Sequence, residues 1–366
     1  ESLYCSECEE QPWSSKCSCN DRFCDPCVES HLTEKRVRQG HSKVDTRTAD
    51  NAWNLVTGAF GPAADLFKQD ELAKWFGIYT NKNKKSQRSS QIVETSRFVD
   101  LAHESLSHTK SPQRQYPSIC SFIGDTGSGK STLIRFLIAR SENAQAKNLS
   151  EAPMAGATGG AAATLSTTGE VNLYKDPKSF GKTTPIFYAD CEGMMGTEPV
   201  AAQHQHEWTK NGRRYPVETP NGEPVDRRMA VMTIYPRFLY MFSDVVCYVT
   251  RNQKTWADSA LKLLEWSNVG AENSINKNVL PALIIILNAP SLEEETWLGD
   301  GPEPTDAFFN VIEGEISASS KFATLARMGD GETMSMKQLF ARSFSSVYVH
   351  YIPLYGYKKL GTAQRI

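Results

Sequence analysis

Apolar runs of strand length alternate with helical patterns from residue 116 onward. The main runs are SICSFIG (118–124), EVNLY (170–174), TPIFYAD (184–190), DVVCYVT (244–250), ALIIILN (282–288) and SVYVHYI (346–352). The first run is followed by STLIRFLIAR, a helical pattern, and 170–174 is expected to form a hairpin with 184–190. Alternating strands and helices predict an α/β domain over 115–366, with a mostly parallel sheet and helices on both faces.

The segment before this domain has a different pattern. Residues 64–78 and 92–106 carry apolar side chains at helical spacing. In the first of them these are Leu66, Phe67, Leu72, Trp75 and Phe76. The basic, polar joint NKNKKSQRSS lies between the two segments and is interpreted as a solvated linker. The pattern predicts a helical linker over 44–114, preceded by a small module over 1–43.

Composition limits the possible partners. The 366 residues include 40 Lys and Arg against 42 Asp and Glu, and 40% are hydrophobic. This balance is that of a folded protein, and it provides no overall field that would attract nucleic acid, so no nucleic-acid partner is expected. The N-terminus does not resemble a secretion signal, and no apolar run is long enough to cross a bilayer. A cytoplasmic location is expected, and this segment offers no support for membrane contact.

Cysteine and histidine cluster in the first module. Six of the nine cysteines lie within the first 27 residues. The eight candidate zinc ligands are Cys5, Cys8, Cys17, Cys19, Cys24, Cys27, His31 and His41. Eight such ligands match two tetrahedral zinc sites with four ligands each. The alternative, reduced cysteines in a small core, is disfavoured because so short a segment with few large apolar residues could hardly fold without metal.

This spacing resembles a B-box zinc finger, in which ligand pairs alternate between two metals. The resemblance implies that Cys5, Cys8, Cys24 and Cys27 hold one ion and that Cys17, Cys19, His31 and His41 hold the other. The single residue between Cys17 and Cys19 departs from the family, which usually has two or more there. No ligand position is left open for water, so the finger is expected to be structural or to bind a protein partner. A ubiquitin ligase would also need a RING finger, which these residues lack.

A glycine-rich loop follows the run 118–124 and carries the strongest signal in the sequence. Its residues match G-x4-G-K-[ST], and a helical pattern follows. The candidate phosphate-binding residues are Gly124, Asp125, Thr126, Gly127, Ser128, Gly129, Lys130, Ser131 and Thr132. The glycines allow backbone N–H groups to surround a polyphosphate, Lys130 can reach the β and γ oxygens, and the Ser131 hydroxyl can bind Mg²⁺.

Two further segments are candidates for sensing the γ-phosphate. Asp190-Cys-Glu-Gly193 ends the run 184–190, so that its carboxylate would hold a Mg²⁺-bound water and the Gly193 amide would face the phosphate. Residues 154–169 are rich in Gly, Ala and Thr, as expected of a loop that becomes ordered when a threonine binds Mg²⁺. Thr167 is the first choice for that threonine and Thr168 the second. The alternative is a mobile loop with no contact to the nucleotide.

Together, Gly124 to Ser131, Thr167 to Gly169 and Asp190 to Gly193 resemble the nucleotide-binding motifs of the dynamin superfamily of large GTPases. The most similar branch contains guanylate-binding proteins, atlastins and the root-hair-defective type. The resemblance covers about residues 115–355. It implies a P-loop NTPase fold of the G-domain type, bound GTP or GDP with Mg²⁺, GTP hydrolysis and nucleotide-dependent homodimers. The catalytic set would be Lys130, Thr167, Asp190 and Gly193.

The sequence departs from this family in the groups that assist hydrolysis. Gly127 stands where the guanylate-binding branch has an internal arginine, and Met194 follows Gly193 where a water-orienting glutamine would lie. Transition-state charge must then be neutralised from elsewhere. The candidate arginines are Arg213, Arg214, Arg227, Arg228 and Arg251. Hydrolysis is expected to be slow or to depend on dimerisation, and a scaffold that binds nucleotide with little hydrolysis is the main alternative.

Base selectivity is the remaining question. A guanine-reading aspartate should follow the run 282–288, but the sequence there is Asn288-Ala-Pro-Ser. Asn288 fits the first position of one version of the guanine motif, while the aspartate is absent. Guanine selectivity therefore rests on the family resemblance, and an ATP-specific enzyme stays open.

Overall fold

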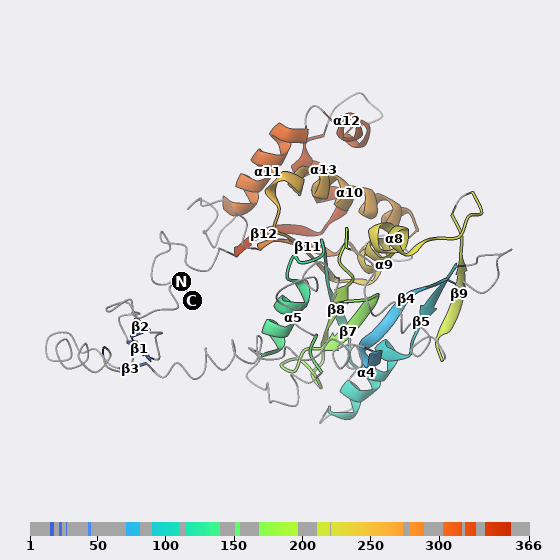
Figure 1. Cartoon of the computed structure of the whole chain (residues 1–366), viewed down its shortest axis with the longest axis vertical. Coiled ribbons are helices and arrows are strands. Elements are labelled where there is room, and N and C mark those ends of the chain that lie inside the picture. The colour runs from blue at the N-terminus through green and yellow to red at the C-terminus, as the bar shows by residue number, and fades with distance from the viewer. Residues whose placement is uncertain are drawn as a thin grey trace.

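The computed structural model describes residues 15–17, 22–23, 27, 43–44, 71–80, 90–109, 114–139, 151–153, 168–196, 211–219, 221–273, 279–288, 303–316, 319–326 and 334–352. Most of them belong to one α/β unit around a nine-stranded sheet (Figure 1). The strand order is β12-β11-β10-β6-β8-β7-β4-β5-β9.

One half of the sheet is parallel, as expected. Its strands are β6 (Ser118–Gly124), β8 (Ile186–Cys191), β10 (Val245–Thr250), β11 (Ala282–Asn288) and β12 (Ser346–Ile352). Each neighbouring pair among them is parallel. The carboxyl ends of the five strands therefore meet at one edge, where α/β proteins place their ligands.

The other half of the sheet is antiparallel, so the sheet as a whole is mixed. Its strands are β7 (Val171–Lys175), β4 (Lys74–Thr80), β5 (Ser90–Glu94) and β9 (Arg213–Val217). The predicted hairpin is confirmed, because β7 pairs with β8 in antiparallel register. Figure 1 shows β4, β5 and β9 extending the sheet away from β12.

The helical linker predicted over 44–114 is wrong for the strands β4 and β5. Residues 74–80 form β4 between β7 and β5, and residues 90–94 form β5. The apolar residues of β4 are buried on both sides of the strand, among them Trp75, Phe76 and Ile78. A short continuous apolar run cannot be distinguished from a buried helical segment by periodicity. Only the second part of 92–106 is helical, within α4 (Arg97–Ser107), so the sheet includes strands that precede residue 115.

Helices cover both faces of the sheet, as predicted. Alternate residues of β6 show the two faces: Ile119 and Ile123 join one apolar cluster, and Phe122 joins the other. The larger cluster receives side chains from α4, α9 (Tyr235–Phe242), α10 (Trp256–Asn273), α11 (Glu303–Ile316), α12 (Ser320–Ala326) and α13 (Met336–Ser343). The smaller cluster packs under α5 (Lys130–Ala139).

Near the N-terminus, three short strands form an antiparallel sheet in the order β2-β1-β3. They are β1 (Ser15–Cys17), β2 (Arg22–Phe23) and β3 (Lys43–Val44). Of the predicted zinc ligands, Cys17 ends β1 and Cys27 has a half-buried side chain, while the other six lie outside the described residues. Within the described ranges, no three His, Cys, Asp or Glu side chains are grouped to hold a metal. The two zinc ions and the B-box assignment therefore stay predictions.

Among the helices that the structure describes, none has the length and apolar character needed to cross a bilayer.

Candidate functional site

The glycine loop, residues 124–131, connects β6 to α5 at the carboxyl edge of the sheet. Gly124 has φ +151°, and a Cβ added there would lie 2.0 Å from the carbonyl oxygen of Val249 on β10. Gly127 and Gly129 have φ +74° and +96°, in the left-handed region that favours glycine. A Cβ at Gly127 would meet nothing within 4 Å, so the loop is open on that side. The predicted strand, loop and helix context of the motif is confirmed.

The Lys130 side chain closes over the base of the glycine loop. Its Nζ donates to the carbonyl oxygens of Gly124 at 3.1 Å and Asp125 at 3.0 Å, and the residue is only 5% exposed. Burial lowers the pKa of the Lys130 amine, while the nearby Asp190 carboxylate acts in the opposite direction. An ammonium held among backbone carbonyls of this loop is poised for an anionic ligand.

Three side-chain oxygens converge beside the loop, at the end of β8. Ser131 Oγ donates to Asp190 Oδ2 at 2.7 Å, and Thr168 Oγ1 donates to the same oxygen at 3.0 Å. The Ser131 and Thr168 hydroxyl oxygens lie 2.9 Å apart. The structure therefore brings together Ser131, Asp190 and the second-choice threonine. The first choice, Thr167, lies outside the described residues.

The chemistry of this oxygen triangle fits a hard cation. A hydroxyl carries one proton, so when Ser131 and Thr168 both donate to Asp190, their lone pairs face each other. Asp190 is 1% exposed, and burial raises the pKa of its carboxyl group, while Lys130 lowers it. Hydroxyl and carboxylate oxygens are the ligands that Mg²⁺ prefers.

Further polar atoms around the loop are orphaned. Thr126 Oγ1, Ser128 Oγ and Asp190 Oδ1 are buried without a hydrogen-bond partner in the described part of the chain. Buried polar atoms nearly always have a hydrogen-bond partner, so three unpaired atoms gathered at one place indicate that a ligand or ordered water provides the missing hydrogen bonds. The residues present thus fit both an anion on the loop and a cation beside it.

The segment 190–196, which spans the end of β8 and the turn after it, is joined to the glycine loop by backbone hydrogen bonds. Thr126 N donates to Met194 O at 2.8 Å, and Met194 N donates to Gly124 O at 3.1 Å. A Cβ added at Gly193 would lie 2.5 Å from Thr126 Cα. The predicted sensor segment therefore touches the loop directly, and Gly193 is required by this close approach.

We expect alanine at Gly193 and alanine at Gly196 to destabilise the protein by different routes. The Gly193 Cβ would meet Thr126 Cα at 2.5 Å, Oγ1 at 2.6 Å and N at 2.8 Å, whereas the three atoms nearest the Gly196 Cβ all belong to the Thr126 side chain, with Oγ1 at 2.3 Å. Each substitution should lower the free energy of unfolding by about 1–3 kcal/mol, as measured by urea denaturation. Adding Thr126→Ala should restore more of the loss for Gly196→Ala than for Gly193→Ala, because the Gly193 Cβ would still meet the Thr126 backbone. Equal rescue of both variants would contradict this packing.

Asn288 links the end of β11 to the glycine loop. Its Nδ2 donates to Ser128 O at 2.7 Å, and the same atom would lie 2.5 Å from a Cβ at Gly129. Asn288 thereby supports the loop from the side opposite the 190–196 turn. The segment 289–300, where a base-reading residue was expected, lies outside the described residues.

Other residues near the site were not predicted. Lys74 on β4 is buried, and its Nζ donates to Gly169 O beside Thr168. Its positive charge also lowers the pKa of the Asp190 carboxyl, against the larger effect of burial. The available signal was a lysine beside the apolar residues of 64–78, which the helical interpretation did not single out.

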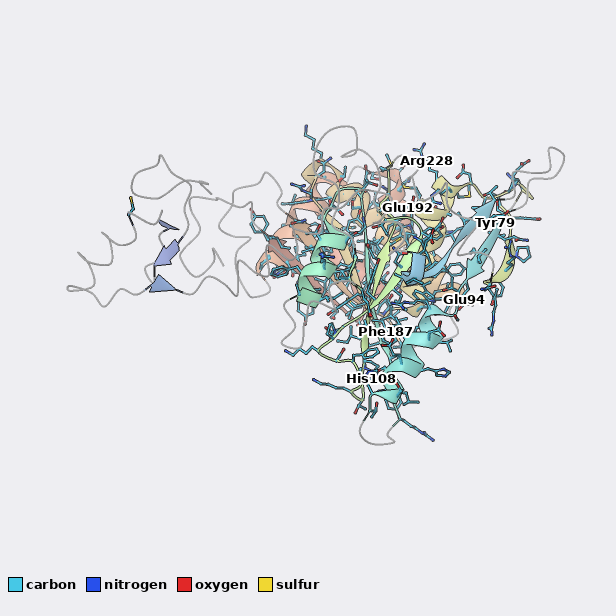
Figure 2. The ribbon with its side chains drawn as sticks, turned by 60° about the horizontal axis from the view of Figure 1, so that its bottom comes forward. Tyr79, Glu94, His108, Phe187, Glu192 and Arg228 are labelled. Atoms are coloured by element: carbon cyan, nitrogen blue, oxygen red, sulfur yellow. The ribbon has the colours of Figure 1, made fainter. Side chains whose placement is uncertain are left out.

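The candidate arginines are spread over several parts of the fold. Arg227, at the start of α8 (Arg227–Met229), forms ion pairs with Glu170 and Glu192, so its charge is already engaged. Arg213 and Arg214 belong to β9 at the far edge of the sheet. Arg228 and Arg251 are exposed. Figure 2 shows Glu192 near Arg228, at the same end of the sheet, with Phe187 farther along β8.

Comparison with known proteins adds little to this geometry. The chain has 12% identity and a TM-score of 0.32 to the signal recognition particle receptor SRb-GTP/SRX complex from Chaetomium thermophilum, covering 63% of this chain and 92% of that one. It has 9% identity and a TM-score of 0.21 to the siderophore hydrolase EstB from Aspergillus nidulans, covering 79% and 92%. No family model and no curated protein matches the sequence.

Proposed function

We propose that this chain binds a nucleoside triphosphate together with Mg²⁺ on the glycine loop and hydrolyses its terminal phosphate. The observation that carries the proposal is the meeting of Ser131, Thr168 and Asp190 oxygens within 3.0 Å of one another, beside a loop that matches G-x4-G-K-S. A polyphosphate loop with a hard-cation site next to its first helical turn is the arrangement that phosphoryl transfer requires.

Each residue has a separate role in this proposal. Backbone N–H groups of the glycine loop surround the phosphates, and the Lys130 ammonium neutralises charge on the β and γ oxygens. Ser131 and a switch threonine, Thr168 or Thr167, orient the cation, and Asp190 accepts hydrogen bonds from its water shell. Mg²⁺, when bound, supplies charge neutralisation at the phosphate oxygens. The Gly193 amide is proposed to face the terminal phosphate.

Hydrolysis by the isolated chain is proposed to be slow. Gly127 and Met194 supply neither an arginine nor a water-orienting amide, and Arg227 is paired with two carboxylates. Loss of such groups costs several orders of magnitude in rate. This observation favours the second candidate function, a nucleotide-dependent scaffold, in which binding changes conformation with little turnover.

GTP and GDP are the proposed nucleotides, on the motif resemblance alone. The Asn288 side chain donates to the Ser128 carbonyl of the glycine loop, and this contact does not distinguish guanine from adenine. ATP is therefore tested in parallel with GTP. Nucleotide-dependent homodimerisation and a protein partner at the zinc-finger module, with two bound zinc ions, are proposed on the same resemblance.

The proposal is tested with equilibrium binding of fluorescent GTP, GDP and ATP analogues, each in Mg²⁺ and in EDTA. We expect Mg²⁺ to increase the affinity for one triphosphate by about tenfold or more, since the cation links the protein hydroxyls to the phosphates. Single-turnover phosphate release then separates an enzyme from a scaffold. If neither triphosphate binds in a Mg²⁺-dependent way, both candidate functions fail.

A further inference from the structure

Arg227 is held between two carboxylates that come from different loops. Its Nη1 contacts Glu170 Oε1 and its Nη2 contacts Glu192 Oε2, while its Nε donates to Glu192 Oε1 at 3.1 Å. The side chains of Glu170 and Glu192 are 2% and 5% exposed, and that of Arg227 is 11% exposed. The planar guanidinium therefore grips Glu192 with two nitrogens and Glu170 with the third.

The two glutamates are also joined to each other by one backbone–side-chain and one backbone–backbone hydrogen bond. Glu170 N donates to Glu192 Oε2 at 2.8 Å, and Glu192 N donates to Glu170 O at 2.8 Å. Each lies two positions after a residue of the oxygen triangle: Glu170 after Thr168, and Glu192 after Asp190. Fixing the glutamates against each other thus fixes the spacing between the Thr168 hydroxyl and the Asp190 carboxylate.

A π-helix between α8 and α9 allows two residues of the same helix, Arg227 and Tyr235, to contact the glutamate pair. Arg227 and Tyr235 are eight positions apart on a continuous helix, α8, the π-helix η3 (Ala230–Ile234) and α9. Eight positions on a regular α-helix would separate their directions by roughly 80°, but the extra residue of a π-turn reduces this to about 20°. Accordingly, the Tyr235 hydroxyl donates to Glu170 Oε2, on the same carboxylate that Arg227 contacts.

Stability alone does not explain this arrangement. Two buried carboxylates share one guanidinium, with Ile78 N donating to Glu170 Oε2 at 3.0 Å. Buried ion pairs seldom stabilise a fold more than apolar residues of the same volume, and an excess buried charge is costlier still. A role in holding Thr168 and Asp190 at the spacing that the cation site needs would explain why Arg227 is paired with both carboxylates.

We propose that Arg227 is a positioning residue for the cation site: it clamps Glu170 to Glu192 and so sets the distance between Thr168 and Asp190. This inference rests on the proposed function, because it concerns the same site. It assigns to Arg227 a role distinct from the transition-state arginine considered from the sequence.

The test compares Arg227→Gln and Arg227→Lys with the matched control Arg228→Gln, the neighbouring exposed arginine of the same helix. The full chain is titrated with the fluorescent triphosphate that the wild type binds, in Mg²⁺ and in EDTA. Residues that orient metal ligands contribute about 10- to 100-fold to metal affinity. We expect Arg227→Gln to reduce the Mg²⁺-dependent gain in nucleotide affinity by about tenfold and to leave the affinity in EDTA unchanged. Arg228→Gln should have the wild-type affinity in both Mg²⁺ and EDTA.

Arg227→Lys separates clamping from charge. Lysine keeps one positive charge but cannot bind both carboxylates at once. The thermal midpoint of Arg227→Lys should therefore lie between those of Arg227→Gln and the wild type, while its Mg²⁺-dependent gain in nucleotide affinity stays as low as in Arg227→Gln. If Arg227→Gln does not fold, Tyr235→Phe, which removes only the hydroxyl at Glu170, should show a smaller loss in the same direction. A wild-type Mg²⁺-dependent gain in Arg227→Lys or in folded Arg227→Gln overturns the clamp. Absence of that gain in the wild type itself overturns the proposed function instead.

Discussion

Lys130→Met should weaken binding of the triphosphate by at least about tenfold, because one or two hydrogen bonds to a charged phosphate, each contributing about 1.5–3 kcal/mol, are lost. Methionine keeps most of the volume and the buried stem. The Lys130 ammonium also donates to two carbonyl oxygens of the loop, so the thermal midpoint of the nucleotide-free variant is measured beside its affinity to check that it folds. The measurement is the affinity for the fluorescent triphosphate at saturating Mg²⁺.

A matched lysine makes this result specific. Lys262 on α10 is half-buried, and its charge acts on the Asp125 carboxyl. Lys262→Met therefore changes the local charge in the same way without removing a group from the base of the loop. We expect its affinity to fall by less than that of Lys130→Met, because a charge near the loop is lost but no hydrogen bond to the phosphate. Wild-type affinity in Lys130→Met would mean that the phosphates do not lie on the glycine loop.

Asp190→Asn should reduce the gain in triphosphate affinity that Mg²⁺ provides by about 100-fold. The rate of phosphate release should fall by at least the same factor. The amide oxygen can still accept from Ser131 and Thr168, so the shape of the site is kept while its negative charge is lost. Because the wild-type carboxylate is buried, the amide should be tolerated by the fold. Affinity measured in EDTA should change little, which distinguishes loss of the cation site from loss of the phosphate site.

The control is Asp244→Asn. Asp244 lies at the opposite end of β6, where its Oδ2 accepts from Ser118 Oγ and Ile119 N, both at 2.9 Å. Its substitution tests the general effect of removing a carboxylate from this sheet. Loss of Mg²⁺ dependence in both variants would show that the effect does not arise at the oxygen triangle.

The parallel half of the sheet was predictable because its strands are short apolar runs separated by helical patterns and a recognisable loop. β6 and β11 begin and end at the predicted residues. β4 was missed for a physical reason: a strand buried on both faces shows no alternation, and Trp75 and Phe76 fit a helical face equally well. Of its two partners, β7 was predicted as the run 170–174, whereas β5 lies in a segment that was interpreted as helical.

The candidate site was predictable only where a contiguous motif encodes it. The glycine loop and Asp190 come from such motifs, and the structure places Ser131 and Asp190 in contact. The choice between Thr167 and Thr168 depends on a loop conformation that composition does not specify. Contacts between distant segments, such as Lys74 with Gly169 or Arg227 with Glu170, have no local signature at all.

The position of β4 bears on how the chain folds during synthesis. β4 leaves the ribosome before the glycine loop, yet Lys74 and Ile78 find their partners, Gly169 and Glu170, 95 and 92 positions later. Until β7 is made, a strand with buried tryptophan and phenylalanine has no native neighbour on that side. Such non-local pairing slows folding and exposes nascent chains to association, so the emerging N-terminal half is where a chaperone would be needed most.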